Sequence, residues 1–284
     1  MLVKEMKSSL WWVYIYNIHF MHSYVHYKLI HSTSAYNSSV TFAHYMKQEV
    51  QTIFTEGQVL LVDKPIEWTS HDVVAKVRNT IKIKKVGHAG TLDPLATGLL
   101  ILCTGKFTKK INEYQAREKE YTGTFTIGAV TPTYDLESEP EQLKDYSFVT
   151  EELIHETTKQ FIGDIMQVPP THSAIKRDGK PVYLLARKGV DVVLDPRPLH
   201  ISEFEITKID PIVIGLPVFH FRVVCSTGTY IRSLAHDFGK ALGCGAYLSS
   251  LRRTRIGEFT SEQARSLPET LEWIKEQKQQ YENL

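Results

Sequence analysis

The stretch Val86-Gly87-His88-Ala89-Gly90-Thr91-Leu92-Asp93-Pro94-Leu95-Ala96-Thr97-Gly98 places one carboxylate in a loop directly before the apolar run Leu99-Leu100-Ile101-Leu102-Cys103. Three glycines and a proline in so few residues indicate a backbone with positive φ or a close approach to another group. Pro94 fixes the chain direction after Asp93. A catalytic aspartate would be displayed in such a loop. The alternative from the residues alone is an ordinary turn whose aspartate caps a helix.

The composition is that of a globular protein with a sizeable core. The 284 residues are 42% hydrophobic and 23% charged, enough for one large domain or two small ones. A formal charge of +1 gives no whole-protein argument for nucleic acid, so any RNA affinity must come from local basic patches.

Three basic patches are visible in the sequence, and two of them flank the Asp93 loop. Patches of this kind are usually solvated faces. Their position around Asp93 favours phosphate contacts, which supply most of the sequence-independent affinity for nucleic acid. The patches are Lys82, Lys84 and Lys85, then Lys106, Lys109 and Lys110, then Arg252, Arg253 and Arg255.

The three cysteines, Cys103, Cys225 and Cys244, have no metal-ligand spacing and lie in apolar or glycine-rich surroundings. An odd count without a C-x-x-C pair argues against a disulfide framework and against a zinc site. We expect reduced core cysteines, no metal and a cytoplasmic protein.

The first 45 residues differ in composition from the rest. They hold four charged side chains but five of the 12 histidines and six of the 14 tyrosines. We expect an extension outside the fold, with Met46 as the true start and normal folding and turnover without residues 1–45. A signal peptide over residues 10–20 is the alternative, but Asn17 and His19 interrupt that run, which is also too short to span a membrane.

Hydrophobic patterning from residue 46 onward predicts α+β structure with a largely antiparallel sheet. Strands are expected over residues 59–62, 121–127 and 218–225, and helices over 150–161 and 270–280. Ser70 is the expected cap of a helix with Val73, Val74, Val77 and Ile81 on one face. Thr229 is the expected cap of a second helix with the stripe Ile231, Leu234, Ala235, Phe238 and Leu242, ended by Gly243. Residues 99–103 are too few to assign as strand or helix.

The Asp93 loop and five further motifs, in order along the chain, resemble those of the bacterial tRNA pseudouridine-55 synthases, the TruB-type pseudouridine synthases. The resemblance covers roughly residues 56–259 and implies the pseudouridine synthase fold with an RNA-gripping insertion. Besides the Asp93 loop, the matching stretches are Leu61-Val62-Asp63-Lys64-Pro65, Lys119-Glu120-Tyr121, Gln167-Val168-Pro169-Pro170 onward to Gly189, Ser226-Thr227-Gly228-Thr229-Tyr230-Ile231-Arg232-Ser233-Leu234, and Leu251-Arg252-Arg253-Thr254.

The resemblance also implies roles for individual residues. Asp93 matches the catalytic aspartate, and Tyr121 matches the tyrosine proposed for proton transfer that stacks on the target base. Tyr230 would help to close the pocket, Leu251 would pack on the uracil, and His88 would hold the looped-out nucleotide. We further expect RNA contacts from Lys64, Lys84, Lys85, Arg252 and Arg253.

Arg232 is the natural counter-ion for Asp93. Its guanidinium would hold the carboxylate through two parallel hydrogen bonds and lower its pKa. A surface salt bridge with Asp237 or another acid is the alternative.

The expected function is isomerisation of uridine 55 in the tRNA T loop to pseudouridine, an intramolecular-transferase reaction that needs no cofactor. The expected partner is the T-arm stem-loop of tRNA. We expect a monomer that does not associate with a membrane. The expected domains are a catalytic domain over residues 46–260 with an insertion at about 169–198, and a short helical tail over 261–284 in place of a C-terminal RNA-binding domain. The alternatives are a tRNA-folding chaperone with dispensable catalysis, and a glycosidase in which Glu120 or Asp237 supplies a second carboxylate.

Overall fold

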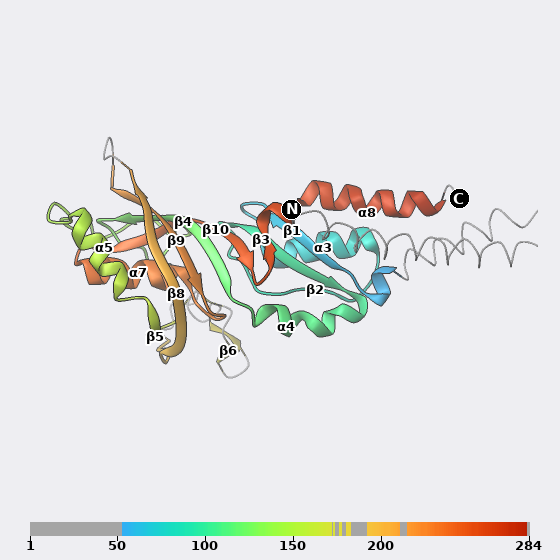
Figure 1. Ribbon diagram of the computed structural model, residues 1–284, viewed down its shortest axis with the longest axis horizontal. Helices are drawn as coiled ribbons and strands as arrows, with labels where there is room; N and C mark the ends of the chain where they lie inside the picture. Colours follow the sequence, from blue (N-terminus) through green and yellow to red (C-terminus); the bar gives the residue numbers. More distant parts are fainter. Residues whose placement is uncertain are drawn as a thin grey trace, which may run out of the picture. The chain divides into compact units, whose positions relative to one another are not determined.

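One mixed sheet organises the part of the chain that the computed structural model describes, residues 53–171, 173, 176–177, 180–182, 192–210 and 215–282 (Figure 1). These residues belong to the unit Glu49–Leu284, and the expectations for residues 1–45 lie outside them. The elements are β1 Val59–Lys64, α3 Ser70–Ile81, β2 Val86–His88, β3 Ala96–Thr104, η1 Gly105–Lys110, α4 Ile111–Gln115, β4 Lys119–Ile127, α5 Glu151–Lys159, β5 Gly163–Gln167, β6 Lys176–Arg177, β7 Lys180–Pro181, β8 Arg197–Ile209, β9 Val218–Cys225, α7 Ile231–Leu242, β10 Ala246–Ile256, β11 Phe259–Thr260, η2 Ser261–Gln263, β12 Arg265–Ser266 and α8 Leu267–Glu282.

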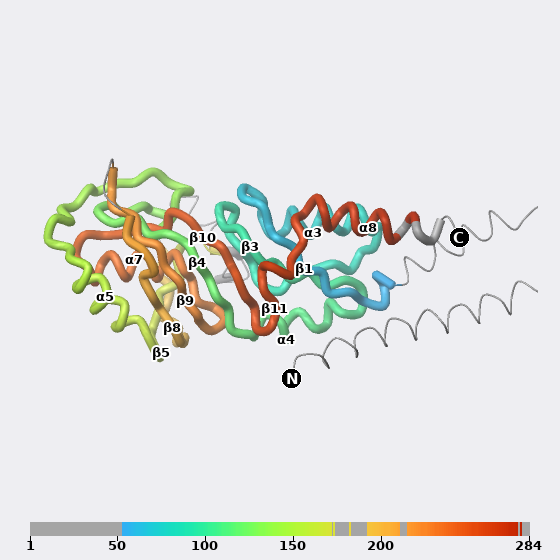
Figure 2. Tube along the Cα trace, turned by 45° about the horizontal axis from the view of Figure 1, so that its top comes forward, coloured from blue at the N-terminus to red at the C-terminus, as the bar shows by residue number. Residues whose placement is uncertain are grey.

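The strands are ordered β12-β1-β3-β10-β4-β9-β8-β5, with β2 paired to β3 and β11 paired to β10. Among the described strands, only β1 with β12 and β3 with β10 pair in parallel. The expected α+β class with a largely antiparallel sheet is therefore confirmed. Figure 2 shows β10 between β3 and β4, the position from which it reaches the Asp93 loop on one side and Tyr121 on the other.

Two hydrophobic clusters support the two halves of this sheet. In one half, α3 and α8 pack on each other and bury Val77 and Ile274 with Leu100 of β3. In the other half, aromatic rings from β4, β8, β9 and α7 fill the core, and the rings of Phe125 and Phe221 stack 4.2 Å apart. The expected strands and helices are present, residues 99–103 belong to the buried strand β3, and the three cysteines are buried and free.

The cap of α3 is Thr69, so the prediction of Ser70 is wrong by one residue. The Thr69 hydroxyl accepts from the Asp72 N–H at 3.0 Å, and the Asp72 carboxylate accepts from the Thr69 N–H at 3.0 Å. This reciprocal capping box satisfies two helix-end donors. The buried Ser70 hydroxyl instead accepts from the Leu92 N–H at 2.8 Å, which ties α3 to the loop that carries Asp93.

The cap prediction for α7 is also wrong, because Tyr230 occupies the cap position without a side-chain cap hydrogen bond. The Thr229 hydroxyl donates to the Ser226 carbonyl at 3.0 Å and so closes the preceding turn. The predicted apolar stripe is buried, and Gly243 ends the helix in the left-handed region at φ 84°.

The predicted insertion at 169–198 is described only in part. Its described residues include the two-stranded hairpin of β6 and β7 and the buried Val182. At the chain's C-terminal side, α8 includes the helix expected over residues 270–280, and Leu267 and Ile274 are buried against α3 and β1.

Candidate active site

Three neighbouring strands and one helix bring the predicted catalytic residues together. Leu251 of β10 pairs with Ala96 of β3, and Arg253 pairs with Tyr121 of β4. Asp93 precedes β3, so its loop, Leu251 and Tyr121 lie at adjoining positions of the sheet. Arg232 reaches the same place from the first turn of α7.

The glycines of the loop meet the conformational demand that the sequence indicates. Gly90 and Gly98 have φ values of 100° and 98°, where a side chain is strained. Gly98 also lies against the backbone of β10, because a Cβ added there would stand 2.3 Å from the Arg253 carbonyl oxygen. The predicted positive φ and close approach are confirmed at these positions.

Asp93 and Arg232 form a two-point ion pair. The Arg232 Nε lies 2.9 Å from Asp93 Oδ2, and Nη2 donates to Oδ1 at 3.1 Å. The Arg232 side chain is 5% exposed, whereas that of Asp93 is 34% exposed. The guanidinium is therefore enclosed by protein, while one side of the carboxylate remains open.

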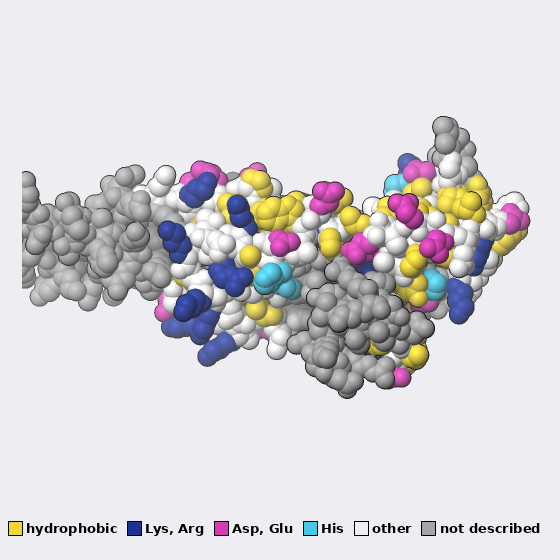
Figure 3. Space-filling model, turned by 180° about the vertical axis from the view of Figure 1, so that it is seen from behind, with side chains coloured by type: hydrophobic (Ala, Val, Ile, Leu, Met, Phe, Trp, Pro, Cys, Tyr) yellow, Lys and Arg dark blue, Asp and Glu magenta, His cyan; other side chains and the backbone are white. Residues whose placement is uncertain are grey.

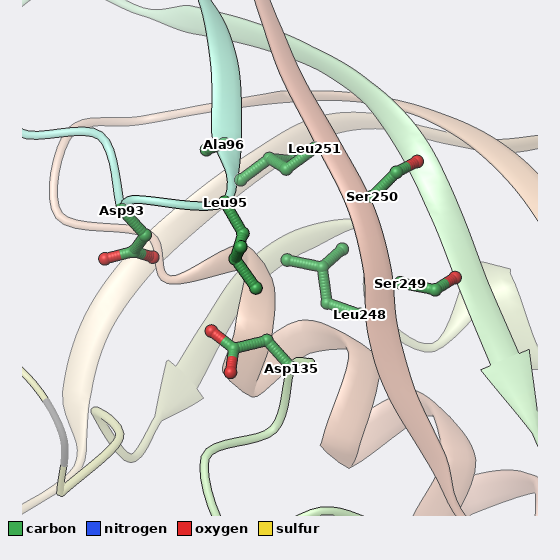
Figure 4. A pocket seen from close by; sticks show the side chains of 8 residues that line it. All are labelled: Asp93, Leu95, Ala96, Asp135, Leu248, Ser249, Ser250 and Leu251. Carbon is green, nitrogen blue, oxygen red and sulfur yellow. The ribbon is translucent and has the colours of Figure 1, made fainter. Parts of the chain in front are cut away.

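A second carboxylate, Asp135, lies near the same Nε of Arg232 and was missed by the sequence analysis. Its Oδ2 is 3.5 Å from Arg232 Nε, and its side chain is buried. Asp93 and Asp135 both line a small cavity of about 20 Å³, and Figure 4 shows Leu95 beside the two carboxylates. A loop aspartate without periodic neighbours gives no sequence signal, so only the fold reveals this pair of acids around one arginine.

Burial raises the pKa of Asp93 above its ordinary value of 3.8. Arg232 opposes this rise, and the charge of Asp135 adds to it. The sequence analysis expected Arg232 to lower the pKa of Asp93. The guanidinium does act in that direction, but desolvation of the carboxylate outweighs it.

The open side of Asp93 faces a cavity of about 510 Å³, a size typical of small-ligand sites. Its wall combines the ion pair with aromatic and aliphatic side chains. Of the predicted site residues, the cavity is lined by Asp93, Tyr121, Tyr230, Arg232, Leu251 and Arg253.

Both tyrosines of the cavity keep their phenol protons near neutral pH. Burial raises the pKa of Tyr121 and that of Tyr230 above the ordinary value of 10.0. Tyr230 is also held through its backbone, because the buried Gln167 side chain accepts from its N–H at 2.9 Å and donates to its carbonyl at 3.1 Å. Gln167 thus joins the end of β5 to the start of α7.

Two of the cations expected to contact RNA, Lys64 and Arg253, are buried and donate to backbone carbonyls. The Lys64 ammonium, 0% exposed, donates to the carbonyls of Pro65, Trp68 and Pro94 at 2.5–3.2 Å. Burial lowers its pKa to about 8.

The Arg253 guanidinium, 1% exposed, donates to the carbonyls of Leu99, Gly90 and Thr91 at 2.8–3.4 Å. Arg253 therefore joins the residues before and after Asp93, and Lys64 holds the Pro94 carbonyl directly after it.

The other predicted binding residues lie outside the cavity wall. Arg252 makes a two-point pair with Asp63 at 3.0 and 2.8 Å. Lys84 and Lys85 are exposed, and His88 is half-buried at the end of β2. Burial lowers the pKa of His88, and the charge of Arg253 acts in the same direction, so this imidazole is neutral at pH 7.

Lys119 is a further buried cation of the cavity wall that the sequence analysis did not single out. It donates to the carbonyls of Gln115 and Arg117 at 2.6 and 2.5 Å, and burial lowers its pKa to about 8. The described residues contain no cluster of three side chains that could hold a metal ion. Among the described helices, none combines the length and the apolar character that crossing a membrane requires.

The architecture around this cavity is the pseudouridine synthase fold. A solved H/ACA RNP bound to a substrate RNA containing 2′-deoxyuridine matches with 28% identity and a TM-score of 0.58, over 81% of this chain and 57% of that chain. A Cbf5-Nop10-Gar1 complex matches with 31% identity and a TM-score of 0.59, over 79% and 56%. The chain thus spans somewhat more than half the length of these solved chains.

The chain belongs to the TruB family of pseudouridylate synthases. The family's N-terminal domain matches residues 78–231, and the tRNA pseudouridylate synthase B C-terminal domain matches residues 232–284. The tRNA pseudouridine synthase B of Flavobacterium johnsoniae is 56% identical over 72% of this chain and 91% of its own length. That of Phocaeicola vulgatus is 50% identical over 79% and 96%.

Proposed function

We propose that the chain isomerises uridine 55 in the T loop of tRNA to pseudouridine, with Asp93 as the nucleophile or base. The observation that carries the proposal is a carboxylate held at two points by a buried guanidinium, with its open side toward a cavity lined by Tyr121 and Leu251. Relatives named tRNA pseudouridine synthase B, one of them 56% identical, support the choice of tRNA.

The reaction breaks the N1–C1′ bond of uridine and forms a C5–C1′ bond. One proton leaves C5 and one proton is gained at N1, so the product is an isomer of the substrate. No electron acceptor or phosphoryl donor enters this balance, and we propose that no cofactor or metal is used. The protein must supply an anionic group, retain the detached uracil while it turns, and receive the C5 proton.

The first two requirements have side chains in the cavity wall. For the third we propose Tyr121, the residue that the family resemblance assigns to proton transfer. Asp93 supplies the anion, and Arg232 fixes its plane. The ring of Tyr121 and the side chain of Leu251 offer apolar surfaces for the uracil. Because its raised pKa keeps its proton on, we propose that the Tyr121 phenol acts as a hydrogen-bond donor in the resting site.

A uracil stacked in an RNA loop cannot reach Asp93, so the target nucleotide must be flipped into the cavity. We propose that His88, Tyr230 and the exposed lysines 84 and 85 contact the RNA around that nucleotide. The same proposal places the enzyme in the cytoplasm as a monomer that binds the T arm.

The glycosidase alternative receives no support from the two acids named for it. Glu120 accepts from Arg222 at 2.7 and 3.1 Å and from Thr254 at 2.8 Å, and neither Glu120 nor Asp237 lines the cavity. Asp135 is buried against Arg232 and does not line the large cavity.

The test is mapping of pseudouridine in a T-arm stem-loop after incubation with the wild-type protein or with Asp93→Asn, without added metal or cofactor. Conversion at position 55 by the wild type alone is the expected result. Release of free uracil would indicate the glycosidase. RNA binding with no conversion by either protein would overturn the proposal and favour the tRNA-folding role.

A further inference from the structure

Two lysine groups that are separate in the sequence form one surface in the fold. Lys82, Lys84 and Lys85 precede β2, whereas Lys106, Lys109 and Lys110 lie in η1, directly after β3. β2 pairs with β3 so that Val86 faces Thr104, and the Gly105 N–H donates to the Lys85 carbonyl at 2.9 Å. The last lysine of the first group is therefore hydrogen-bonded, through its backbone, to the residue directly before the second group.

We call these six lysines, together with Arg78 of α3, the lysine surface. All six lysines are exposed. Within the part of the chain that the structure describes, Lys106 with Glu56 is the one ion pair that a member makes. Figure 3 shows Lys and Arg side chains gathered at the end of the molecule that carries α3 and η1.

Seven basic residues with one acidic partner, in a chain of formal charge +1, leave the remainder of the protein net acidic. The third basic patch of the sequence does not contribute. Arg253 is buried, Arg252 pairs with Asp63, and Arg255 pairs with Glu118. Of the three basic patches, the positive charge available to a partner therefore lies on the lysine surface, and the partner it fits is a polyanion.

The lysine surface is hollowed as well as charged. Arg78, Asn79, Lys82, Ile83 and Lys84 line an open depression of about 490 Å³ at the end of α3. Lys82 occupies the left-handed position that ends this helix, at φ 64°. Three cations around one depression, with an amide beside them, suit phosphate groups in a row better than a single carboxylate.

The lysine surface is continuous with the active-site loop. β2 begins directly after Lys85 and ends at His88, and its three residues span about 10 Å. The loop then continues through Gly90 and Thr91, which line the cavity, to Asp93. A nucleic acid with one nucleotide in the cavity has its flanking backbone within reach of these lysines.

We propose that the lysine surface binds the phosphate backbone of the RNA helix that carries the target loop, as a second contact outside the active-site cavity. The proposal rests on the proposed function for the identity of the RNA. It assigns to α3, β2 and η1 the electrostatic affinity that the nearly neutral chain as a whole lacks.

The test measures the dissociation constant for an unmodified tRNA transcript between about 50 and 300 mM salt, with Asp93→Asn as the parent so that no turnover occurs. The surface variant carries Lys82→Gln, Lys85→Gln, Lys109→Gln and Lys110→Gln. The matched control removes the same charge from the other half of the sheet, with Lys144→Gln, Lys159→Gln, Lys208→Gln and Lys240→Gln, all of them exposed.

The surface variant is expected to bind roughly tenfold or more weakly at about 100 mM salt, because it has lost phosphate contacts. Each lost contact should also reduce the magnitude of the negative slope of log K against log salt by about 0.9. The control should keep a slope within about 1 of that of the parent. Equal slopes for the surface variant and the parent would overturn the proposal, as would an equal loss in the control.

A version with arginine at the same four positions guards against a folding effect. It keeps the charge and is expected to bind like the parent, and failure of this rescue would also overturn the proposal. Since binding alone is measured, absence of isomerisation by the wild type would refute the proposed function and leave this result readable.

Discussion

The guanidinium of Arg232 holds both oxygens of Asp93, with Nε 2.9 Å from Oδ2 and Nη2 3.1 Å from Oδ1, across 139 positions of sequence. The planar fork of an arginine fixes the plane of a carboxylate, which the single ammonium of a lysine does not do. Asp135 Oδ2 lies 3.5 Å from the same Nε, so a second carboxylate shares this guanidinium. We infer that the direction of the Asp93 oxygens is set by this three-residue arrangement.

Replacement of Arg232 by alanine is expected to abolish most turnover and to leave much of the RNA binding in place. The Asp93 carboxylate would lose its orienting partner, and we expect a rate loss of about a thousandfold or more. Arg232→Lys keeps the charge but not the fork, and it should recover less than about a tenth of the wild-type rate. Single-turnover rates at saturating RNA, with dissociation constants measured in parallel, check both values. A wild-type rate in Arg232→Ala would refute the role of the ion pair.

The acid limb of the rate profile should report Asp93. The proposed chemistry needs the ionised carboxylate, so activity is present above its pKa and is lost as the pH falls through it. Burial raises this pKa, which places the limb of kcat/KM above 3.8. Asp135→Asn removes a charge that contributes to the rise, and it should move the limb to lower pH.

Asp237→Asn is the control for this pH shift, since Asp237 is not among the charges that act on Asp93. It should leave the position of the limb unchanged. A limb that moves to higher pH in Asp135→Asn would contradict the assignment.

Much of the fold could be predicted because its signals are local. The apolar face of α3, the stripe of α7 and the alternation in β4 follow from periodicity, and Gly243 ends α7 as predicted. The two cap predictions failed by one residue each. At α7 the cap is Tyr230, which makes no side-chain cap hydrogen bond, whereas at α3 threonine and serine both suit the start of the helix. Tertiary contacts decide among them, as the hydrogen bond between Ser70 and Leu92 shows.

The site could be predicted only where a motif carried it. The motifs named Asp93, Tyr121, Tyr230, Arg232 and Leu251, and the fold brings all five to one cavity. Burial does not show in a motif, so the sequence did not reveal that Lys64 and Arg253, both expected to contact RNA, are buried. Asp135 lies outside every motif, and Lys119 and Gln167 lie in motifs that gave them no role. The contacts of all three arise from strand order and register.

Arg253→Met should destabilise the protein, whereas Arg252→Met should not. Arg253 donates to three carbonyls around the Asp93 loop, and their loss should lower the free energy of unfolding by about 3 kcal/mol. Arg252 is 40% exposed, and its pair with Asp63 is expected to contribute about 1 kcal/mol or less. Urea unfolding of the two variants measures the difference. Equal midpoints would show that the buried guanidinium does not hold the loop.

Gly98→Ala and Gly163→Ala separate the cost of positive φ from the cost of close packing. Both glycines have nearly the same φ, 98° and 96°, so both substitutions incur backbone strain of about 1–2 kcal/mol. A Cβ at Gly98 would lie 2.3 Å from the carbonyl oxygen and 2.7 Å from the nitrogen of Arg253, whereas at Gly163 it would meet no atom within 4 Å.

Because β3 and β10 would have to separate at Gly98, we expect Gly98→Ala to lose about 4 kcal/mol or more in urea unfolding, against about 1–2 for Gly163→Ala. The same separation would displace the Asp93 loop from Leu251, so turnover should fall in Gly98→Ala even at temperatures where the variant is folded. Gly163 lies at the start of β5 and serves as the control, with turnover expected to stay at the wild-type level. Equal losses of stability in the two variants would mean that β3 and β10 can part at little cost, and that Gly98 is required for its φ alone.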